Sequence, residues 1–332
     1  MTQQHSFGMQ FSRTIITRTK VLPVLAGLAA TLAVGMQPAH AATSTPVETC
    51  GTVLAAPGKY HLTNDLGPCE GHGVEITASN VEFTLAGFTI AGQSTPDNCN
   101  RDNPQHGIFA QAPATNVHIN GGKVTGFVDG IVLSASYSQV SAMTVQDNCV
   151  FGIAVQGIKN VIDTNEVTGS GTDGIILARA SNALVTANHA HDNNRFGIGI
   201  SEFSDGNTIR SNILRHNGLS IDAPQGGGVA VFNGNNNIIR GNAANENFDG
   251  IFLSVSISGT LIQDNTANGN MSVGIAIGSD GAENLVKNNT ARNNGIIDLS
   301  DASPACGANT WRKNTFATDS VAGGPDSTNC IK

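Results

Sequence analysis

A glycine followed by a short aliphatic strand recurs along most of this chain, and this repeat restricts the fold more than any other feature. The intervals between these glycines are 22 to 24 residues, with one longer interval of 31. The glycines are Gly107, Gly130, Gly152, Gly174, Gly197, Gly228, Gly250 and Gly274. A separate asparagine series has intervals of 23 to 25 residues and one of 30: Asn165, Asn188, Asn212, Asn242, Asn265, Asn289 and Asn314. Because two unrelated markers share one period and lengthen over the same stretch, the chain is built from stacked repeats.

Each repeat contains short β-strands. Side chains alternate in Gly130–Leu133, so Ile131 and Leu133 point to one side of the strand and Val132 to the other. The equivalent inward pairs are all aliphatic: Ile153/Val155, Ile175/Leu177, Ile198/Ile200, Val229/Val231, Ile251/Leu253 and Ile275/Ile277. A repeat of about 23 residues holds roughly three such strands. If each strand pairs with its copy one coil away, about 4.8 Å along the axis, the result is an all-β parallel solenoid of about ten coils.

Asparagine is suited to the corners between these strands. It tolerates a left-handed backbone, and its amide can bond to the amide of the next coil in a ladder. A second asparagine five residues further along marks another corner: Asn193, Asn217, Asn247, Asn270 and Asn294.

Two segments near the start carry a resemblance to a known family. They are Cys50–Asp65, which contains Pro57-Gly58-Lys59-Tyr60-His61-Leu62, and Val81–Ile90. With the repeats, they resemble the pectate-lyase-like superfamily of right-handed parallel β-helices, and especially its NosD-type, or carbohydrate-binding and sugar hydrolase, repeats. The resemblance covers roughly residues 47 to 320 and implies the fold. It indicates polysaccharide as the partner but not a particular activity, because one fold hosts many functions.

The first 41 residues are typical of a signal peptide. Three basic residues precede the apolar stretch Val21–Met36, and Ala39-His40-Ala41 has the small residues of a cleavage site. We therefore expect export to the periplasm or the medium, and no membrane association after cleavage. Residues 42–72 are expected to cap one end of repeats that span 73–304. Residues 305–332 cap the other end, with Trp311 covering the last coil.

Charge and cysteine content narrow the function further. Without the three basic leader residues, 14 Lys and Arg face 25 Asp and Glu, a formal charge of −11. This balance argues against nucleic acid as a partner, since phosphate binding depends on Lys and Arg. Six cysteines in an exported chain favour disulfides. The simplest pairing joins neighbours and staples both ends: Cys50–Cys69, Cys306–Cys330 and, less securely, Cys99–Cys149. We expect a monomer.

Two insertions interrupt the regular repeat, at Gln93–His106 and Leu219–Gly226. Both enter at the same corner and are expected to bracket the coils that start at Gly130, Gly152, Gly174 and Gly197. Four coils give a trough of roughly 19 Å, the length of a short oligosaccharide. An alternative is that these are ordinary surface loops. The predicted substrate contacts are Ser134, Gln156, Ile176, Ser201, Glu202 and Phe232.

Charged residues flank this strip, and four of them are candidate catalytic residues: Asp129, Asp173, Arg179 and Arg195. A lyase or epimerase acting on uronates needs a cation for the carboxylate, a base and a proton donor. In that alternative, Asp173 holds calcium and one of the two arginines neutralises charge or acts as the base. The other interpretation is an Arg179–Glu202 surface ion pair with the aspartates forming turns. Whether the protein is an enzyme stays open.

No metal site is predicted, although His189 and His191, with His216 one coil later, are an alternative as copper or zinc ligands. The NosD resemblance implies a third function, a non-enzymatic maturation or surface protein in the periplasm. The Asp-Pro-His-Asp signature of alginate epimerase relatives is missing, and Asn103-Pro104-Gln105-His106 matches it only in part.

Overall fold

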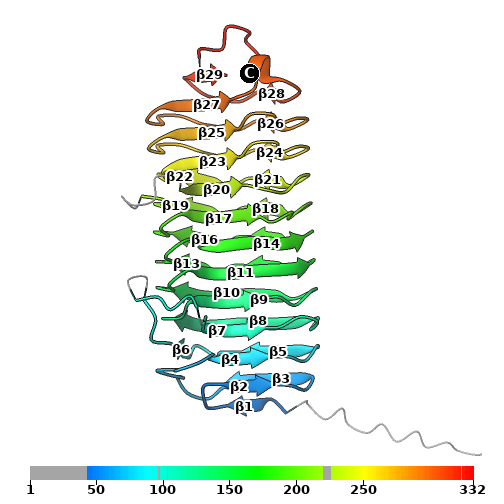
Figure 1. The fold of residues 1–332 in the computed structure, drawn as a ribbon, viewed down its shortest axis with the longest axis vertical. Coiled ribbons are helices and arrows are strands. Elements are labelled where there is room, and N and C mark those ends of the chain that lie inside the picture. The colour runs from blue at the N-terminus through cyan, green and yellow to red at the C-terminus, as the bar shows by residue number, and fades with distance from the viewer. Residues whose placement is uncertain (1–42, 96–97, 103, 220–225, 323) are drawn as a thin grey trace, which may run out of the picture. The chain divides into compact units, whose positions relative to one another are not determined.

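The computed structural model describes residues 43–95, 98–102, 104–219, 226–322 and 324–332. The predicted signal peptide lies outside these residues. The described chain winds into stacked coils whose parallel strands form the faces of a three-sided column (Figure 1). A single 3₁₀ turn, Pro304–Cys306, is the helical element among the described residues. None of them forms a helix with the length and apolar character needed to cross a membrane.

One face of the column, called face 1, is a 12-stranded parallel sheet. Its strands are β2 (Thr52–Leu54), β4 (Val74–Ile76), β7 (His106–Ala110), β9 (Asp129–Leu133), β11 (Phe151–Ile158), β14 (Ile175–Ser181), β17 (Phe196–Ser201), β20 (Gly227–Val231), β23 (Asp249–Leu253), β25 (Val273–Ile277), β27 (Ile297–Asp301) and β29 (Asp319–Val321). This is slightly more than the expected ten coils. The all-β parallel β-helix that the repeat predicts is confirmed.

The remaining strands form two further faces within one 17-stranded sheet. Face 2 contains β1 (Thr45–Val47), β3 (Gly58–Leu62), β5 (Val81–Thr84), β12 (Val161–Asp163), β15 (Leu184–Thr186), β18 (Thr208–Arg210), β21 (Ile238–Arg240), β24 (Leu261–Gln263), β26 (Leu285–Lys287) and β28 (Thr310–Arg312). Face 3 contains β6 (Thr89–Ala91), β13 (Glu166–Thr168), β16 (His189–His191), β19 (Ile213–Arg215) and β22 (Ala243–Asn245). Two longer strands, β8 (Val117–Thr125) and β10 (Gln139–Gln146), contribute to both faces.

The core is a set of aliphatic stacks in register. Ile153 pairs with Ile131 on one side and with Ile175 on the other, and Ile175 pairs with Ile198. All four side chains are completely buried. The repeated glycine is required where each coil enters face 1. At Gly174, a Cβ atom would lie 2.7 Å from the Asn193 amide and 2.9 Å from the next coil's backbone.

Buried asparagines line all three corners. Asn188 shows the pattern: its Oδ1 accepts bonds from the Asn165 backbone and side chain, and its Nδ2 donates to Ile162 O and Asn212 Oδ1. The two predicted ladders are confirmed. A third ladder between faces 1 and 2 escaped prediction: Asn160, Asn207, Asn237, Asn284 and Asn309.

The backbone reason expected for these asparagines is wrong. The left-handed residue is the one before the ladder position, such as Thr164, Ala187 or Asp192, and not the asparagine itself. Asparagine is used because its amide satisfies backbone groups inside the corner, where water is excluded.

Disulfides lie near both ends of the solenoid. All three predicted disulfides are present: Cys50–Cys69, Cys99–Cys149 and Cys306–Cys330. Trp311 is buried, and its Nε1 donates a 2.9 Å bond to Asp301. Residues 42–72, the predicted cap, contribute the first strands β1, β2 and β3.

Candidate functional site

Face 1 carries a groove of about 480 Å³ that crosses four neighbouring coils, from β11 to β20. Its lining residues are Phe151, Ala154, Val155, Gln156, Ile176, Ala178, Arg179, Arg195, Phe196, Ser201, Glu202 and Phe232. Strand register explains the hollow. Ala154, Ile176, Gly199 and Ala230 form one outward row across the four strands. Because three of these four residues are alanine or glycine, the floor lies below the longer side chains around it.

Phenylalanines continue this surface along the axis. The ring centre of Phe232 lies 5.2 Å from that of Phe196 and 6.3 Å from that of Phe252. A second hollow of about 310 Å³ is lined by Phe196, Phe232, Asp249, Phe252 and Ser254. The two hollows share Phe196 and Phe232, so together they form one strip from β11 to β23.

Arg195 lies in the groove and is anchored by Asp173. Its Nε and Nη2 donate bonds of 2.7 and 2.6 Å to the two carboxylate oxygens of Asp173. Its guanidinium carbon lies 5.0 Å from the ring centre of Phe196 and 6.0 Å from that of Phe232. The Asp173 side chain is fully buried, whereas that of Arg195 is 41% exposed. Burial raises the pKa of Asp173, and the bonds from Arg195 and the Phe196 N–H oppose this shift. The two bonds fix the position of the Arg195 guanidinium group in the groove.

The second arginine of the groove forms an exposed ion pair. Arg179 Nε donates a 2.7 Å bond to Glu202 Oε2, and the two side chains are 71% and 51% exposed. This is the surface pair that the sequence offered as the alternative to a catalytic Arg179.

The three aspartates that precede the repeated glycine share a structural role. Asp129, Asp173 and Asp249 each accept a bond from a backbone N–H one coil further on, at 3.2 to 3.3 Å. These aspartates therefore stabilise the contact between neighbouring coils where the chain enters face 1, and Asp129 and Asp249 are strand residues rather than the turn residues of the alternative interpretation. Burial raises the pKa of Asp249, as it does that of Asp173, but the hydrogen bonds that oppose this shift come from Ser272 and the Val273 N–H rather than from an arginine.

The groove brings together most of the residues that the sequence singled out. Those that line it are Gln156, Ile176, Arg179, Arg195, Ser201, Glu202 and Phe232. Asp173 lies behind Arg195. Ser134 is one coil away and donates a 3.5 Å bond to Gln156. Asp129 is not part of the groove and lies 3.2 Å from His106 Nδ1. The groove is thus one coil closer to the C-terminus than the predicted trough, because it begins at the Gly152 coil and ends at the Gly228 coil.

Sequence reasoning missed two aromatic residues of the groove, Phe151 and Phe196. Both directly precede a repeated glycine, which is the position that Asp129 and Asp173 occupy in neighbouring coils. That position lies where the chain enters face 1. A large apolar side chain there is the feature of the sequence that could have identified these groove residues.

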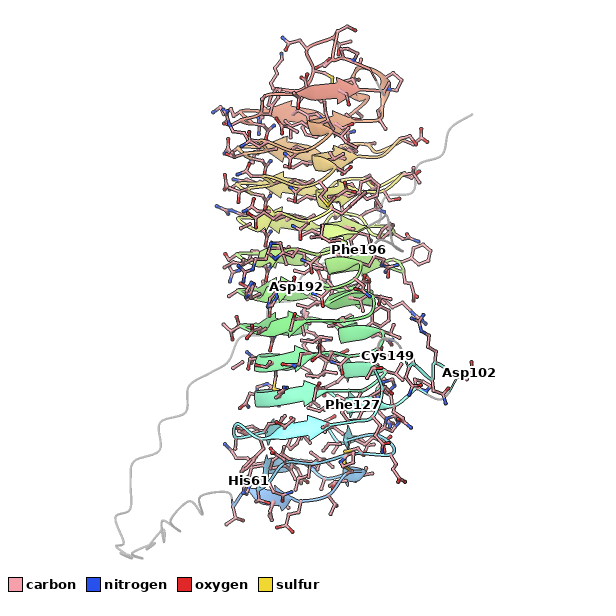
Figure 2. All side chains as sticks on the ribbon, turned by 90° about the vertical axis from the view of Figure 1, so that its left-hand side faces the viewer. His61, Asp102, Phe127, Cys149, Asp192 and Phe196 are labelled. Carbon is pink, nitrogen blue, oxygen red and sulfur yellow. A yellow bond between two sulfur atoms is a disulfide. The ribbon has the colours of Figure 1, made fainter. Side chains whose placement is uncertain are left out.

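Both insertions enter where face 3 leads into face 1, as expected. Gln93–His106 joins β6 to β7, and Cys99 ties it to Cys149. Figure 2 shows Asp102, in this insertion, standing clear of the stacked coils. Leu219–Gly226 joins β19 to β20, but its residues 220–225 lie outside the described chain.

Comparison with known proteins identifies the family. The family model described as "Right handed beta helix region" matches residues 129–320, which is more than half of the chain. This chain belongs to the right-handed β-helix family. No curated protein matches the sequence of this family member.

Solved structures of other β-helix proteins share the fold at low sequence identity. The Dettilon tailspike protein is 18% identical with a TM-score of 0.67, over 84% of this chain and 60% of its own. The periplasmic alginate epimerase AlgG is 17% identical with a TM-score of 0.56, over 79% of this chain and 67% of its own. The Agl-KA catalytic domain is 12% identical with a TM-score of 0.51, over 83% of this chain and 59% of its own. This chain therefore spans about 60% of the tailspike chain.

Proposed function

We propose that this β-helix protein binds a polysaccharide along the strip on face 1. The observation that carries the proposal is the row of phenylalanines beside a low apolar floor, with Arg195 held rigidly among them. Sugar rings present apolar C–H faces and polar edges. Flat aromatic side chains with a few fixed polar groups match such a ligand.

The dimensions support an oligomeric ligand. From β11 to β23 there are four steps between coils, or roughly 19 Å, which accommodates several sugar units. Gln156 and Ser201 offer neutral hydrogen-bonding groups, and the exposed part of Arg195 offers a cation. One of the structural neighbours, AlgG, is an alginate epimerase, and alginate is a polysaccharide. The three disulfides are typical of an oxidising compartment, which supports a site of action in the periplasm or outside the cell.

Binding is tested by affinity electrophoresis and calorimetry against neutral and acidic polysaccharides. We expect Phe232→Ala and Phe151→Ala each to weaken binding about tenfold, because each removes a large apolar contact. The matched control is Tyr137→Ala, which removes an aromatic side chain that is 51% exposed and does not line the groove. The proposal is wrong if no polysaccharide binds, or if the control weakens binding as much as Phe232→Ala does.

A second candidate is a calcium-dependent polysaccharide lyase or epimerase. Asp249 favours it, since this carboxyl group lies in the strip with a raised pKa. A raised pKa suits general acid–base catalysis. Of the four residues that the sequence predicts as catalytic, Asp173, Arg179 and Arg195 are engaged in ion pairs, and Asp129 does not line the groove. Calcium-dependent release of unsaturated uronate, lost in Asp249→Asn, would establish a lyase, and calcium-dependent exchange of the uronate C5 hydrogen with deuterated solvent, lost in the same variant, would establish an epimerase. The absence of product in the wild-type protein would exclude it for the substrates tried.

A non-enzymatic maturation or surface role of the NosD type is a third proposal. Within the described ranges, we find no feature that favours it over polysaccharide binding. If the protein neither binds nor converts any glycan, the maturation or surface role becomes the preferred proposal.

A further inference from the structure

Face 3 carries a cluster of three side chains of the kinds that bind metal ions. Glu166, His189 and His191 each offer one ligand atom, and these atoms all lie within 4.8 Å of one another. Strand geometry brings them together. His189 and His191 alternate outward on β16, with Ala190 buried between them, and Glu166 pairs with His189 on the neighbouring strand β13.

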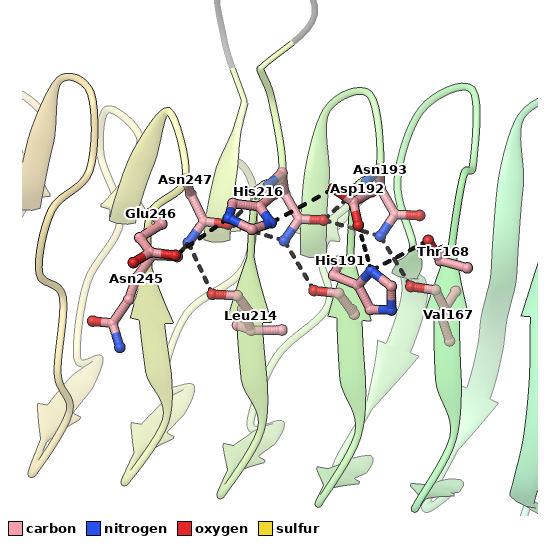
Figure 3. A network of polar contacts seen from close by, with 12 residues as sticks. Val167, Thr168, His191, Asp192, Asn193, Leu214, His216, Asn245, Glu246 and Asn247 are labelled. Atoms are coloured by element: carbon pink, nitrogen blue, oxygen red, sulfur yellow. Dashed lines mark hydrogen bonds and ion pairs between the residues drawn. The ribbon is translucent and has the colours of Figure 1, made fainter.

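Hydrogen bonding prepares His191 for coordination. Its Nδ1 is hydrogen-bonded to Asp192 (Figure 3), with 2.5 Å between Nδ1 and Asp192 Oδ2. Its Nε2 faces Glu166 Oε1 at 3.4 Å. A carboxylate on one ring nitrogen fixes the tautomer that leaves the lone pair of the other nitrogen for a metal. Metal-binding histidines usually have such a partner.

His189 provides the second, independent observation. Its Nε2 atom is buried and has no hydrogen-bond partner within the part of the chain that the structure describes. A buried polar atom without a partner costs free energy, and coordination would satisfy it.

Some of the surrounding charges favour the binding of a cation at this cluster, and others oppose it. Arg215, on the neighbouring strand β19, is the residue opposite His191 in the sheet. Its positive charge opposes the binding of a cation. Asp192 is an exposed carboxylate near the cluster, and His216 lies 3.7 Å from Asp192 and 3.2 Å from the exposed Glu246 of the following coil (Figure 3). His216 is thus held by these acids and is not one of the three clustered ligands.

We propose that Glu166, His189 and His191 bind one divalent transition-metal ion, of which zinc is the best match. Two imidazoles and one carboxylate form a donor set that zinc uses when it keeps a fourth position open. Calcium and magnesium prefer oxygen ligands alone and do not fit. Ligand atoms around tetrahedral zinc are about 3.4 Å apart, so modest side-chain rotations close the site. The ion joins β13 to β16 and is independent of polysaccharide binding on face 1.

Calorimetry with Zn²⁺ on tag-free, EDTA-treated protein tests the site, and the visible absorption of bound Co²⁺ reports its coordination. We expect one ion per chain, a tetrahedral Co²⁺ spectrum, and a higher melting temperature in the presence of Zn²⁺. His191→Ala and His189→Ala should abolish all three. The matched control is His118→Ala, which removes an exposed histidine from β8 and should change nothing.

Two further variants separate this site from adventitious surface binding. Asp192→Asn should weaken Zn²⁺ binding about tenfold, because it removes the partner that orients His191. Arg215→Gln should tighten it several-fold by removing a like charge. If His191→Ala does not fold in metal-free buffer, His191→Gln keeps a donor for Asp192 and removes the ligand. The proposal is overturned if the wild-type protein binds no Zn²⁺, or if binding survives both His189→Ala and His191→Gln.

Discussion

Replacing Arg195 with methionine tests whether the floor of the groove depends on an ion pair with one fully buried partner. Arg195 is 41% exposed, whereas Asp173 is 0% exposed. Methionine keeps most of the apolar stem of arginine but removes both bonds to the carboxylate. In the variant, the Phe196 N–H at 3.3 Å is the remaining donor to Asp173 among the described contacts.

The expected magnitude follows from this asymmetry. Removing one member of a buried pair costs about 3–5 kcal/mol because a buried charge is left without a partner. The exposure of Arg195 lets water reach the vacated position, so we expect the lower end, about 3 kcal/mol. Asp173→Asn should cost about 1 kcal/mol, since the freed arginine can turn into water and asparagine still accepts the Phe196 bond. The exposed partner is therefore the more costly one to remove.

Urea unfolding followed by far-ultraviolet circular dichroism measures these differences. The double variant Asp173→Asn/Arg195→Met should be more stable than Arg195→Met alone, with a coupling of about 2 kcal/mol. The matched control is Arg179→Met, which breaks the exposed pair with Glu202 and should cost less than about 0.5 kcal/mol.

The pH dependence gives a second check. Burial raises the pKa of Asp173 above its ordinary 3.8, and without Arg195 nothing comparable opposes that shift. A carboxyl group with a raised folded-state pKa adds stability when protonated and loses it as pH rises through that pKa. Arg195→Met should therefore recover stability relative to the wild type as pH falls from neutral towards about 4. An Arg195→Met penalty no larger than that of Arg179→Met, or one that grows in acid, would refute this reasoning.

Three further predictions concern stability. Asn193→Ala should lower the free energy of unfolding in urea by about 2–3 kcal/mol, because it leaves buried backbone and amide groups without partners. The control is Asn194→Ala, at the exposed neighbouring residue, which should leave stability nearly unchanged. The raised pKa of Asp249 means that its ionisation opposes folding as pH rises through that value, so Asp249→Asn should stabilise the protein at neutral pH and not in acid; equal effects at both pH values would contradict this. Replacing Cys306 and Cys330 with serine should cost about 3 kcal/mol, given their separation of 24 residues, and should speed hydrogen exchange in the last coil before the rest of the column; uniform exchange would contradict a local role.

Much of this fold can be predicted from the sequence because the interactions repeat. The glycine period, the inward pairs such as Ile131/Leu133, and two asparagine ladders each report a local requirement that recurs in every coil. The disulfide pairing followed from proximity within and between neighbouring coils. The third ladder, which includes Asn207, was missed because serine, alanine and threonine replace asparagine in some of its coils, as at Ala183.

Less of the candidate site could be predicted from the sequence. Sequence alone determined that the outward rows of face 1 are mainly apolar with a few Ser and Gln, and that the charged candidates lie at the flanks of these rows. It did not determine the direction of each side chain at the turn into a strand, where Asp173 points inward to Arg195 and Phe196 frames the groove. The asparagine series aligns Glu166 with His189, 23 residues later, but it did not show that their ligand atoms converge with that of His191. Periodicity encodes which residues share a face, because the backbone enforces that locally. Only the stacked structure decides which of them touch, because contacts between coils depend on register and on the packing of neighbouring side chains.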